Sequence, residues 1–138
     1  MKKNMHKAGF TLIEMVITVL IFAILATISV YTYSSYELRG RRIDAISALL
    51  SISLAEERYR STNTQYGTLA QVWNNVSSSS EGYYTLDISN ISGSSYTITA
   101  TAVGNQANDA SNGTSCATLT LISSDGTITK SPSDCWPT

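Results

Sequence analysis

The sequence predicts an α+β protein in which one long N-terminal helix packs on a four-stranded antiparallel sheet. An apolar run over residues 10–30 leads into an amphipathic stretch over residues 36–61, and together they predict a single helix. Further along the chain, short segments alternate β-branched or aromatic residues with polar ones, which is typical of strands. Two cysteines, Cys116 and Cys135, enclose the last two of these segments. The length of 138 residues suffices for one small globular domain beside an extended helical segment.

The apolar run has the length of a membrane-spanning helix. A helix over its 21 residues measures roughly 31 Å, close to the roughly 30 Å hydrocarbon core of a bilayer. A removable signal peptide has a shorter core, of about 7–15 residues, and ends in a small-residue cleavage site that is not found after this run. We therefore expect a retained anchor. The positive-inside rule does not decide its orientation, because three positive residues lie on each side. They are Lys2, Lys3 and Lys7 before the run, and Arg39, Arg41 and Arg42 after it.

Glu14 is the one charged residue within the apolar run. An ionised carboxylate in hydrocarbon costs several kcal/mol unless it meets a cation or a hydrogen-bond donor. Position alone leaves two interpretations open. The carboxylate can lie at headgroup level near the start of the helix, where the helix dipole favours an anion, or it can serve a function within the membrane.

The second half of the predicted helix is amphipathic. Aliphatic residues recur there at three- and four-residue steps and so share one face of the helix. These residues are Ile43, Ile46, Leu50 and Leu54. Gly40 is a weak point, because glycine costs about 1 kcal/mol relative to alanine in a helix interior.

A polar connection and the strands follow the helix. The sequence STNTQYG ends the helix, and we expect a loop over residues 68–82 in which the serine run 77–80 is flexible. The Asp-Gly pair in SSDGT tolerates the positive φ angles of a tight hairpin. Residues 104–113 form a turn-rich loop without the ligand spacing of a calcium loop, so that no metal is expected. The predicted strands cover residues 83–88, 95–103, 116–122 and 127–130.

Composition and charge argue against several classes of function. The net charge is −1, and only Lys130 is basic after Arg60, so strong non-specific nucleic-acid binding is not indicated. The one histidine precedes the apolar run, which leaves the rest of the chain without a histidine base for a nucleophile. No glycine-rich phosphate loop is present, and the adjacent acids Glu56 and Glu57 are expected to form a solvated helix face. We expect neither an enzyme nor a cofactor.

The sequence alone leaves two interpretations open for the arginine cluster and two for the cysteine pair. The arginines between residues 39 and 42 are either solvated charge close to the membrane or contacts with other subunits. The two cysteines form one disulfide in an exported protein and stay free thiols in a cytosolic one.

The N-terminal sequence KAGFTLIEMVITVLIFAILA resembles the leader and first helix of type IV prepilins, in which a short basic leader ends in glycine before an apolar helix that carries a glutamate. The resemblance implies that a prepilin peptidase cuts between Gly9 and Phe10 and methylates the new amine of Phe10. Glu14 would then accept the charge of the Phe10 α-ammonium of a neighbouring subunit. A buried pair of this kind would favour one axial register between packed helices.

The resemblance extends past the anchor. Residues 31–66 resemble the continuation of PilE-type minor pilins, and CATLTLISSDGTITKSPSDCW resembles their C-terminal pattern of cysteine, glycine and Cys-Trp. A disulfide between Cys116 and Cys135 is therefore expected, and closing a loop of about 20 residues would stabilise by roughly 3 kcal/mol. Many major pilins carry a helix-breaking Gly and Pro that FAILATISVYTY lacks, which favours a minor subunit.

The resemblance implies a type IV pilin fold and a structural role as a minor pilin that supports pilus biogenesis, twitching motility, adhesion or DNA uptake. It implies other pilins, prepilin peptidase and the inner-membrane assembly platform as partners. The protein would lie in the bacterial inner membrane with its C-terminal domain in the periplasm, and then in the pilus. The alternatives are a type II secretion pseudopilin and a pilin-borne module that binds DNA or a surface.

These expectations divide the chain into five segments. They are a leader (1–9), a transmembrane or filament-core helix (10–36), an amphipathic helix half (37–61), a connecting loop (62–82), and an antiparallel sheet with the disulfide region (83–138).

Overall fold

One helix, α1, occupies Leu12–Arg60 without interruption. The computed structural model describes residues 9–137, except for the side chains of residues 29–32. The chain forms two compact units, Met1–Ser35 and Tyr36–Thr138, which are described separately below. The predicted long helix is confirmed, and Gly40 lies within it without a break.

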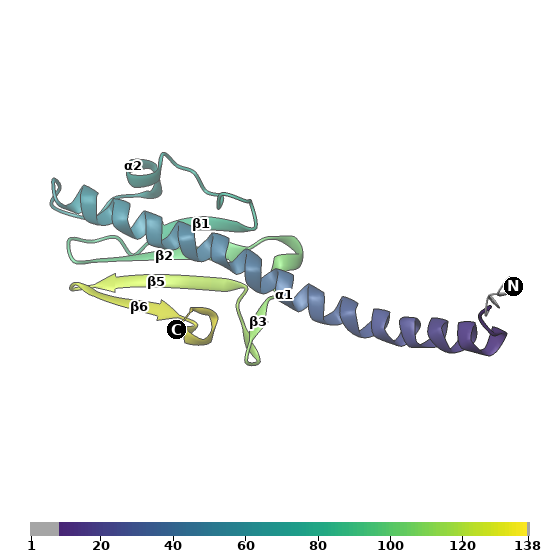
Figure 1. Ribbon diagram of the computed structural model, residues 1–138. Helices are drawn as coiled ribbons and strands as arrows, with labels where there is room; N and C mark the ends of the chain where they lie inside the picture. Colours follow the sequence, from purple (N-terminus) through teal and green to yellow (C-terminus); the bar gives the residue numbers. More distant parts are fainter. Residues whose placement is uncertain (1–8, 138) are drawn as a thin grey trace, which may run out of the picture. The chain divides into compact units, whose positions relative to one another are not determined.

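In the second unit, α1 buries one face against the sheet (Figure 1). Ala45, Leu49 and Ile52 are fully buried, and their spacing of three and four residues puts them on the same side of the helix. This face differs from the predicted one. Ile46 is buried, whereas Ile43 is 63% exposed. The face of α1 that contacts the sheet is rotated by about one residue position from the face that carries the predicted aliphatic residues.

The sheet has four antiparallel strands in the order β1-β2-β5-β6, as the sequence predicts. The strands are β1 (Tyr84–Ser89), β2 (Ser95–Ala102), β5 (Thr118–Ser124) and β6 (Thr127–Ser131). Asp125 and Gly126 join β5 to β6 with φ angles of 49° and 79°, the positive values that the Asp-Gly hairpin requires. The edge strand β6 is exposed at every residue, whereas the other three strands alternate between buried and more exposed side chains.

Two short elements depart from the predicted loops. In the first connection, α2 (Leu69–Trp73) forms a short helix, and Gln71 Oε1 accepts a hydrogen bond of 2.8 Å from the backbone N–H of Thr68. The second loop contains the 3-10 helix η1 (Gly104–Asn108) and a two-stranded hairpin of β3 (Ala110–Ser111) and β4 (Thr114–Ser115). A last 3-10 turn, η2 (Ser133–Cys135), closes the chain.

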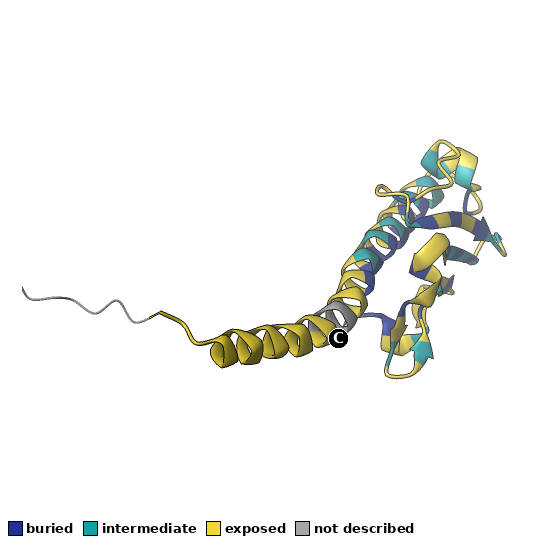
Figure 2. Ribbon diagram, turned by 90° about the vertical axis from the view of Figure 1, so that its right-hand side faces the viewer, coloured by how far each residue is buried: buried dark blue, intermediate teal, exposed yellow. Residues whose placement is uncertain are grey.

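The core lies between α1 and the inward face of the sheet. Figure 2 shows the buried residues gathered along this interface, whereas the described residues of the first unit are exposed. Tyr84 and Tyr96 are the largest fully buried side chains. The expected disulfide joins Cys116 to Cys135, and both residues are buried. It connects the segment just before β5 to the C-terminal turn, and the α+β fold with a disulfide-bounded C-terminal region is therefore confirmed.

Candidate functional site

The start of α1 is closed by a reciprocal cap between Thr11 and Glu14. Thr11 N–H donates to Glu14 Oε2 at 3.4 Å, and Glu14 N–H donates to Thr11 Oγ1 at 3.3 Å. This is a capping box, which satisfies backbone donors that a helix start leaves free. The spacing Thr-x-x-Glu in the sequence would have predicted it. Glu14 thus has a structural use within one chain, and a register role between chains stays a prediction.

Gly9 and Phe10 lie just before the helix, and both are exposed. The rest of the predicted leader, residues 1–8, lies outside the described residues. Exposure of the Gly9–Phe10 bond is compatible with cleavage there, which stays a prediction as well.

The first unit exposes apolar side chains on every side of α1. Phe10, Leu12 and Phe22 are each more than 70% exposed, and every described side chain between residues 9 and 28 is exposed. Among the described residues, α1 is long and apolar enough to cross a membrane. A helix that is apolar all round needs lipid or other helices around it.

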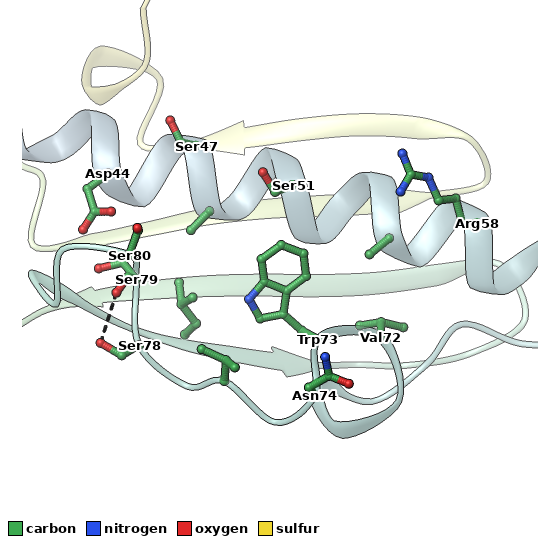
Figure 3. Close-up of a pocket in the computed structure, with 14 residues that line it drawn as sticks. Asp44, Ser47, Ser51, Arg58, Val72, Trp73, Asn74, Ser78, Ser79 and Ser80 are labelled. Atoms are coloured by element: carbon green, nitrogen blue, oxygen red, sulfur yellow. Dashed lines mark hydrogen bonds between the residues drawn. The ribbon is translucent and has the colours of Figure 1, made fainter.

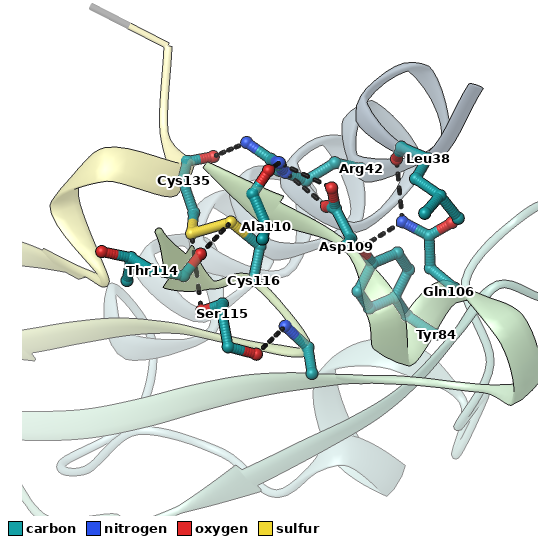
Figure 4. Close-up of polar contacts among 11 residues, drawn as sticks. Leu38, Arg42, Tyr84, Gln106, Asp109, Ala110, Thr114, Ser115, Cys116 and Cys135 are labelled. Atoms are coloured by element: carbon teal, nitrogen blue, oxygen red, sulfur yellow. Dashed lines mark hydrogen bonds and ion pairs between the residues drawn. A yellow bond between two sulfur atoms is a disulfide. The ribbon is translucent and has the colours of Figure 1, made fainter. Parts of the chain in front are cut away.

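In the second unit, Arg42 forms a buried ion pair with Asp109 (Figure 4). Arg42 Nε donates to Asp109 Oδ2 at 2.6 Å, and Nη2 donates to Oδ1 at 2.7 Å, so that the pair is bidentate. Nη1 also donates to the backbone oxygen of Cys135 at 3.3 Å. One arginine therefore ties α1 both to the segment after η1 and to the disulfide.

Gln106 adds a second tie between η1 and α1. Its Nε2 donates to the backbone oxygen of Leu38 at 2.8 Å and to the hydroxyl of Tyr84 at 2.9 Å (Figure 4). Gln106 is almost fully buried, and burial raises the pKa of the Tyr84 hydroxyl. These contacts fix the turn-rich loop, which the sequence did not link to the helix.

The three arginines of the 39–42 cluster have different environments, and neither interpretation, solvated charge or subunit contact, fits Arg42. Arg42 is buried and paired, as described above. Arg41 pairs with Glu37 one helical turn away and stacks over the Tyr83 ring at 4.4 Å. Of these three arginines, Arg39 alone is exposed and forms no salt bridge among the described residues.

The expectation that Glu56 and Glu57 form a solvated face is wrong for Glu56. Glu56 has 0% exposure, and its Oε2 accepts a hydrogen bond of 2.8 Å from the backbone N–H of Gly67. Its Oε1 is buried without a hydrogen-bond partner. Burial raises the pKa of the Glu56 carboxyl, the Gly67 N–H lowers it, and the charge of Glu57 raises it further. Glu57 is exposed, as expected.

Glu57 takes part in a hydroxyl cluster beside Glu56. Tyr66 donates its hydroxyl to Glu57 Oε1 at 3.1 Å, and the Tyr96 hydroxyl lies 2.8 Å from Ser53 Oγ. Burial raises the pKa of both tyrosine hydroxyls. The cluster therefore joins α1, the following loop and β2 through polar groups.

Few cations of the second unit are accessible to solvent, and of these Arg60 is only partly exposed. Arg60 donates to the backbone oxygens of Gly93 and Asn63, at 2.9 and 2.7 Å, and Lys130 lies over the Trp136 ring at 5.1 Å. Together with Arg39 and Arg58 they form no salt bridge within the described residues. In the described part of the second unit, these four groups are the accessible cations without a carboxylate partner.

Comparisons with protein families gave two matches. A model described as "Type IV minor pilin ComP, DNA uptake sequence receptor" matches residues 32–120, which include the second half of α1 and the sheet into β5. A model described as "Prokaryotic N-terminal methylation motif" matches residues 4–30, which contain Gly9, Phe10 and Glu14. No curated protein matches the chain. The first match covers well over half of the sequence and includes most of the globular unit, so the chain belongs to the ComP family of type IV minor pilins.

Proposed function

We propose that this minor pilin is cleaved between Gly9 and Phe10, methylated at Phe10 and assembled into the pilus through α1. The methylation-motif match over residues 4–30 supports the processing step. The apolar surface of α1 supports assembly, since packing against other pilin helices would replace its contact with lipid. The ComP match supports a pilus subunit rather than a secretion pseudopilin.

We propose for Glu14 the register role described above, in addition to its role in the helix cap. Two variants separate the roles. Thr11→Ala removes the hydroxyl of the capping box and keeps the carboxylate, whereas Glu14→Gln keeps a side chain of the same shape and removes the charge. We expect Thr11→Ala to enter sheared pili normally and Glu14→Gln to stay membrane-inserted but to be depleted from them. Equal incorporation of Glu14→Gln and wild type would contradict the register role.

We propose that the globular unit lies on the periplasmic side before assembly. Disulfides form in oxidising compartments, and Cys116 and Cys135 are positioned as a buried pair. Mass spectrometry of exported protein should show the Cys116–Cys135 bond without prior oxidation. Free thiols in that material would argue against this orientation.

We also propose that the globular unit binds DNA in the course of DNA uptake. The ComP family match, which includes residues 36–120 of this unit, carries the proposal. The charge distribution limits its form. The described globular unit has four accessible cations free of carboxylate partners, so the dependence of its log affinity on log salt should be no steeper than about −4.

A salt titration of the processed protein, which lacks the leader lysines Lys2, Lys3 and Lys7, tests this in detergent micelles, with labelled duplexes and single strands as probes. Arg39→Gln, Arg58→Gln and Lys130→Gln should each reduce the slope by about 1 where the residue contacts a phosphate. Glu81→Gln, which removes an exposed negative charge, serves as the control and should not reduce the slope. Failure to bind any duplex or strand at low salt would refute DNA binding.

A further inference from the structure

A groove of about 590 Å³ lies between α1 and the segment that joins α2 to β1 (Figure 3). All the residues that line it belong to the globular unit. Leu86 of β1 is among the lining residues, and α1 forms one long wall. Its volume is in the range of small-ligand sites in proteins, which is about 300–1,000 Å³.

The α1 wall is built from small side chains. Ser47, Ala48, Ser51 and Ala55 line the groove. They follow one another at steps of one, three and four residues, so that they lie along one side of the helix. Because these side chains are short, the space beside the helix stays open.

The opposite wall presents Trp73. In Figure 3 its indole ring projects from the end of α2 toward the helix. Trp73 is only partly buried, and its indole N–H makes no hydrogen bond among the described residues. An indole offers a flat apolar face together with one hydrogen-bond donor.

Several polar groups of the groove also lack partners within the described part of the chain. The hydroxyls of Ser47, Ser51 and Ser80 make no hydrogen bond there. Asp44 Oδ1 accepts from the backbone N–H of Glu81 at 3.3 Å, but its Oδ2 is buried without a partner. A ligand that donates and accepts hydrogen bonds would satisfy these groups.

The charges at the groove favour a neutral ligand. Asp44 lies near one end of the lining and Arg58 near the other, so that one acid and one base balance each other (Figure 3). A polyanion would meet a single cation and an unpaired carboxylate. A fatty chain would leave the hydroxyls and Asp44 Oδ2 unsatisfied, which is unfavourable.

From this combination we propose that the groove binds a neutral glycan. The C–H face of a pyranose ring would cover the Trp73 indole, and its hydroxyls would bond with the serines and with Asp44. An extended peptide fits less well, because the helix wall offers it no free backbone donors or acceptors. The site is separate from the DNA-binding proposal, which needs exposed cations.

Tryptophan fluorescence of the full chain tests the proposal, in a detergent without a sugar headgroup such as a dimethylamine oxide. Trp136→Phe leaves Trp73 as the only tryptophan, because the sequence has two. Chitotetraose and maltotetraose are the probes. A saturable change in Trp73 emission with either probe is the expected result. If Trp136→Phe does not fold, hydrogen exchange of residues 72–80 in wild-type protein replaces the fluorescence signal, with added glycan expected to slow exchange.

Paired leucine variants locate the binding. Ser51→Leu fills the groove from an exposed helix position and should weaken binding by about tenfold or more. Ser94→Leu makes the same change at an exposed position outside the groove and should leave affinity unchanged.

The proposal is overturned if neither glycan binds or if Ser51→Leu binds as wild type does. It is also overturned if residues 72–80 are protected in assembled pili without glycan, which would assign the groove to another subunit. The DNA affinity of Ser51→Leu should equal that of wild type. A failure of the glycan proposal would therefore leave the DNA-binding proposal untouched, and the reverse also holds.

Discussion

At the scale of single residues, Glu56 makes stability depend on pH. Its carboxyl is fully buried, and burial raises its pKa above the ordinary value of 4.5. A carboxyl whose pKa is raised by folding contributes its stability fully below the unfolded-state pKa. That contribution is lost as the pH rises through the raised pKa of the folded state.

Wild-type protein should lose unfolding free energy as the pH rises from acid to neutral, and we expect this loss to be smaller in Glu56→Gln. The free energy of unfolding of wild type should fall relative to that of Glu56→Gln as the pH rises above about 4.5. Denaturant unfolding of both proteins across a pH series measures this difference. Glu81→Gln is the matched control at an exposed position, and its difference from wild type should stay constant. A constant difference for Glu56→Gln would contradict the expectation.

The Arg42–Asp109 pair predicts a second residue-scale effect. Asp109→Ala leaves the Arg42 guanidinium buried without its partner, and the expected loss is about 3–5 kcal/mol of unfolding free energy. The double variant Arg42→Met, Asp109→Leu should lose much less, because no charge stays buried. Breaking the more exposed pair with Glu37→Gln should cost no more than about 1 kcal/mol. Chemical denaturation compares the three, and equal losses for the single and double core variants would argue against the ion pair.

The burial of Arg42 and of Glu56 could not be predicted from sequence patterns. Arg39, Arg41 and Arg42 lie within four positions of one another, yet only the helix phase and the placement of η1 bury Arg42. Glu56 is adjacent to the exposed Glu57, and its burial depends on the loop that brings Gly67 N–H to it. Such pairings join residues distant in sequence, which local periodicity cannot predict.

At the scale of elements, replacing Gly40 in α1 by alanine is expected to stabilise the protein. A Cβ at this position meets no atom within 4 Å, and the residue lies inside α1. Gly40→Ala should raise the free energy of unfolding by about 1 kcal/mol, or several degrees in Tm. Thermal unfolding measures the change.

Gly126→Ala is the natural comparison, because this glycine also meets open space but has a φ of +79°. Its replacement should lower Tm, since residues with a Cβ are strained at that angle. A fall in Tm for Gly40→Ala would show that its helix environment is not open.

The long α1 and the four strands are predictable because their signals are repeated over many residues. The apolar run, the alternation in β2 and the Asp-Gly hairpin each agree with the structure. The short elements cannot be predicted from such repeated patterns. The helix α2 spans only five residues and depends on a Thr-x-x-Gln capping pattern, and β3 and β4 have two residues each.

At the scale of the whole molecule, the two units differ in what they need around them. The described part of Met1–Ser35 has only exposed side chains, whereas Tyr36–Thr138 contains the buried core and the disulfide. A protein consisting of residues 36–138 should therefore be soluble without detergent and unfold in one cooperative transition.

Calorimetry and reduction test this expectation. Reduction of the disulfide should lower the unfolding temperature of the isolated unit, since it opens a loop with a sequence separation of 19. Aggregation of the oxidised fragment, or the absence of a transition, would show that the first half of α1 is needed for folding.

The exposed edge strand β6 bears on the behaviour of many copies at high local concentration. An open strand edge is a template on which another sheet can add, and such growth leads to insoluble fibrils. Here the edge is only five residues long and carries Lys130, two features that discourage this association. Growth of one sheet on another through β6 is therefore disfavoured when many globular units crowd together at a membrane.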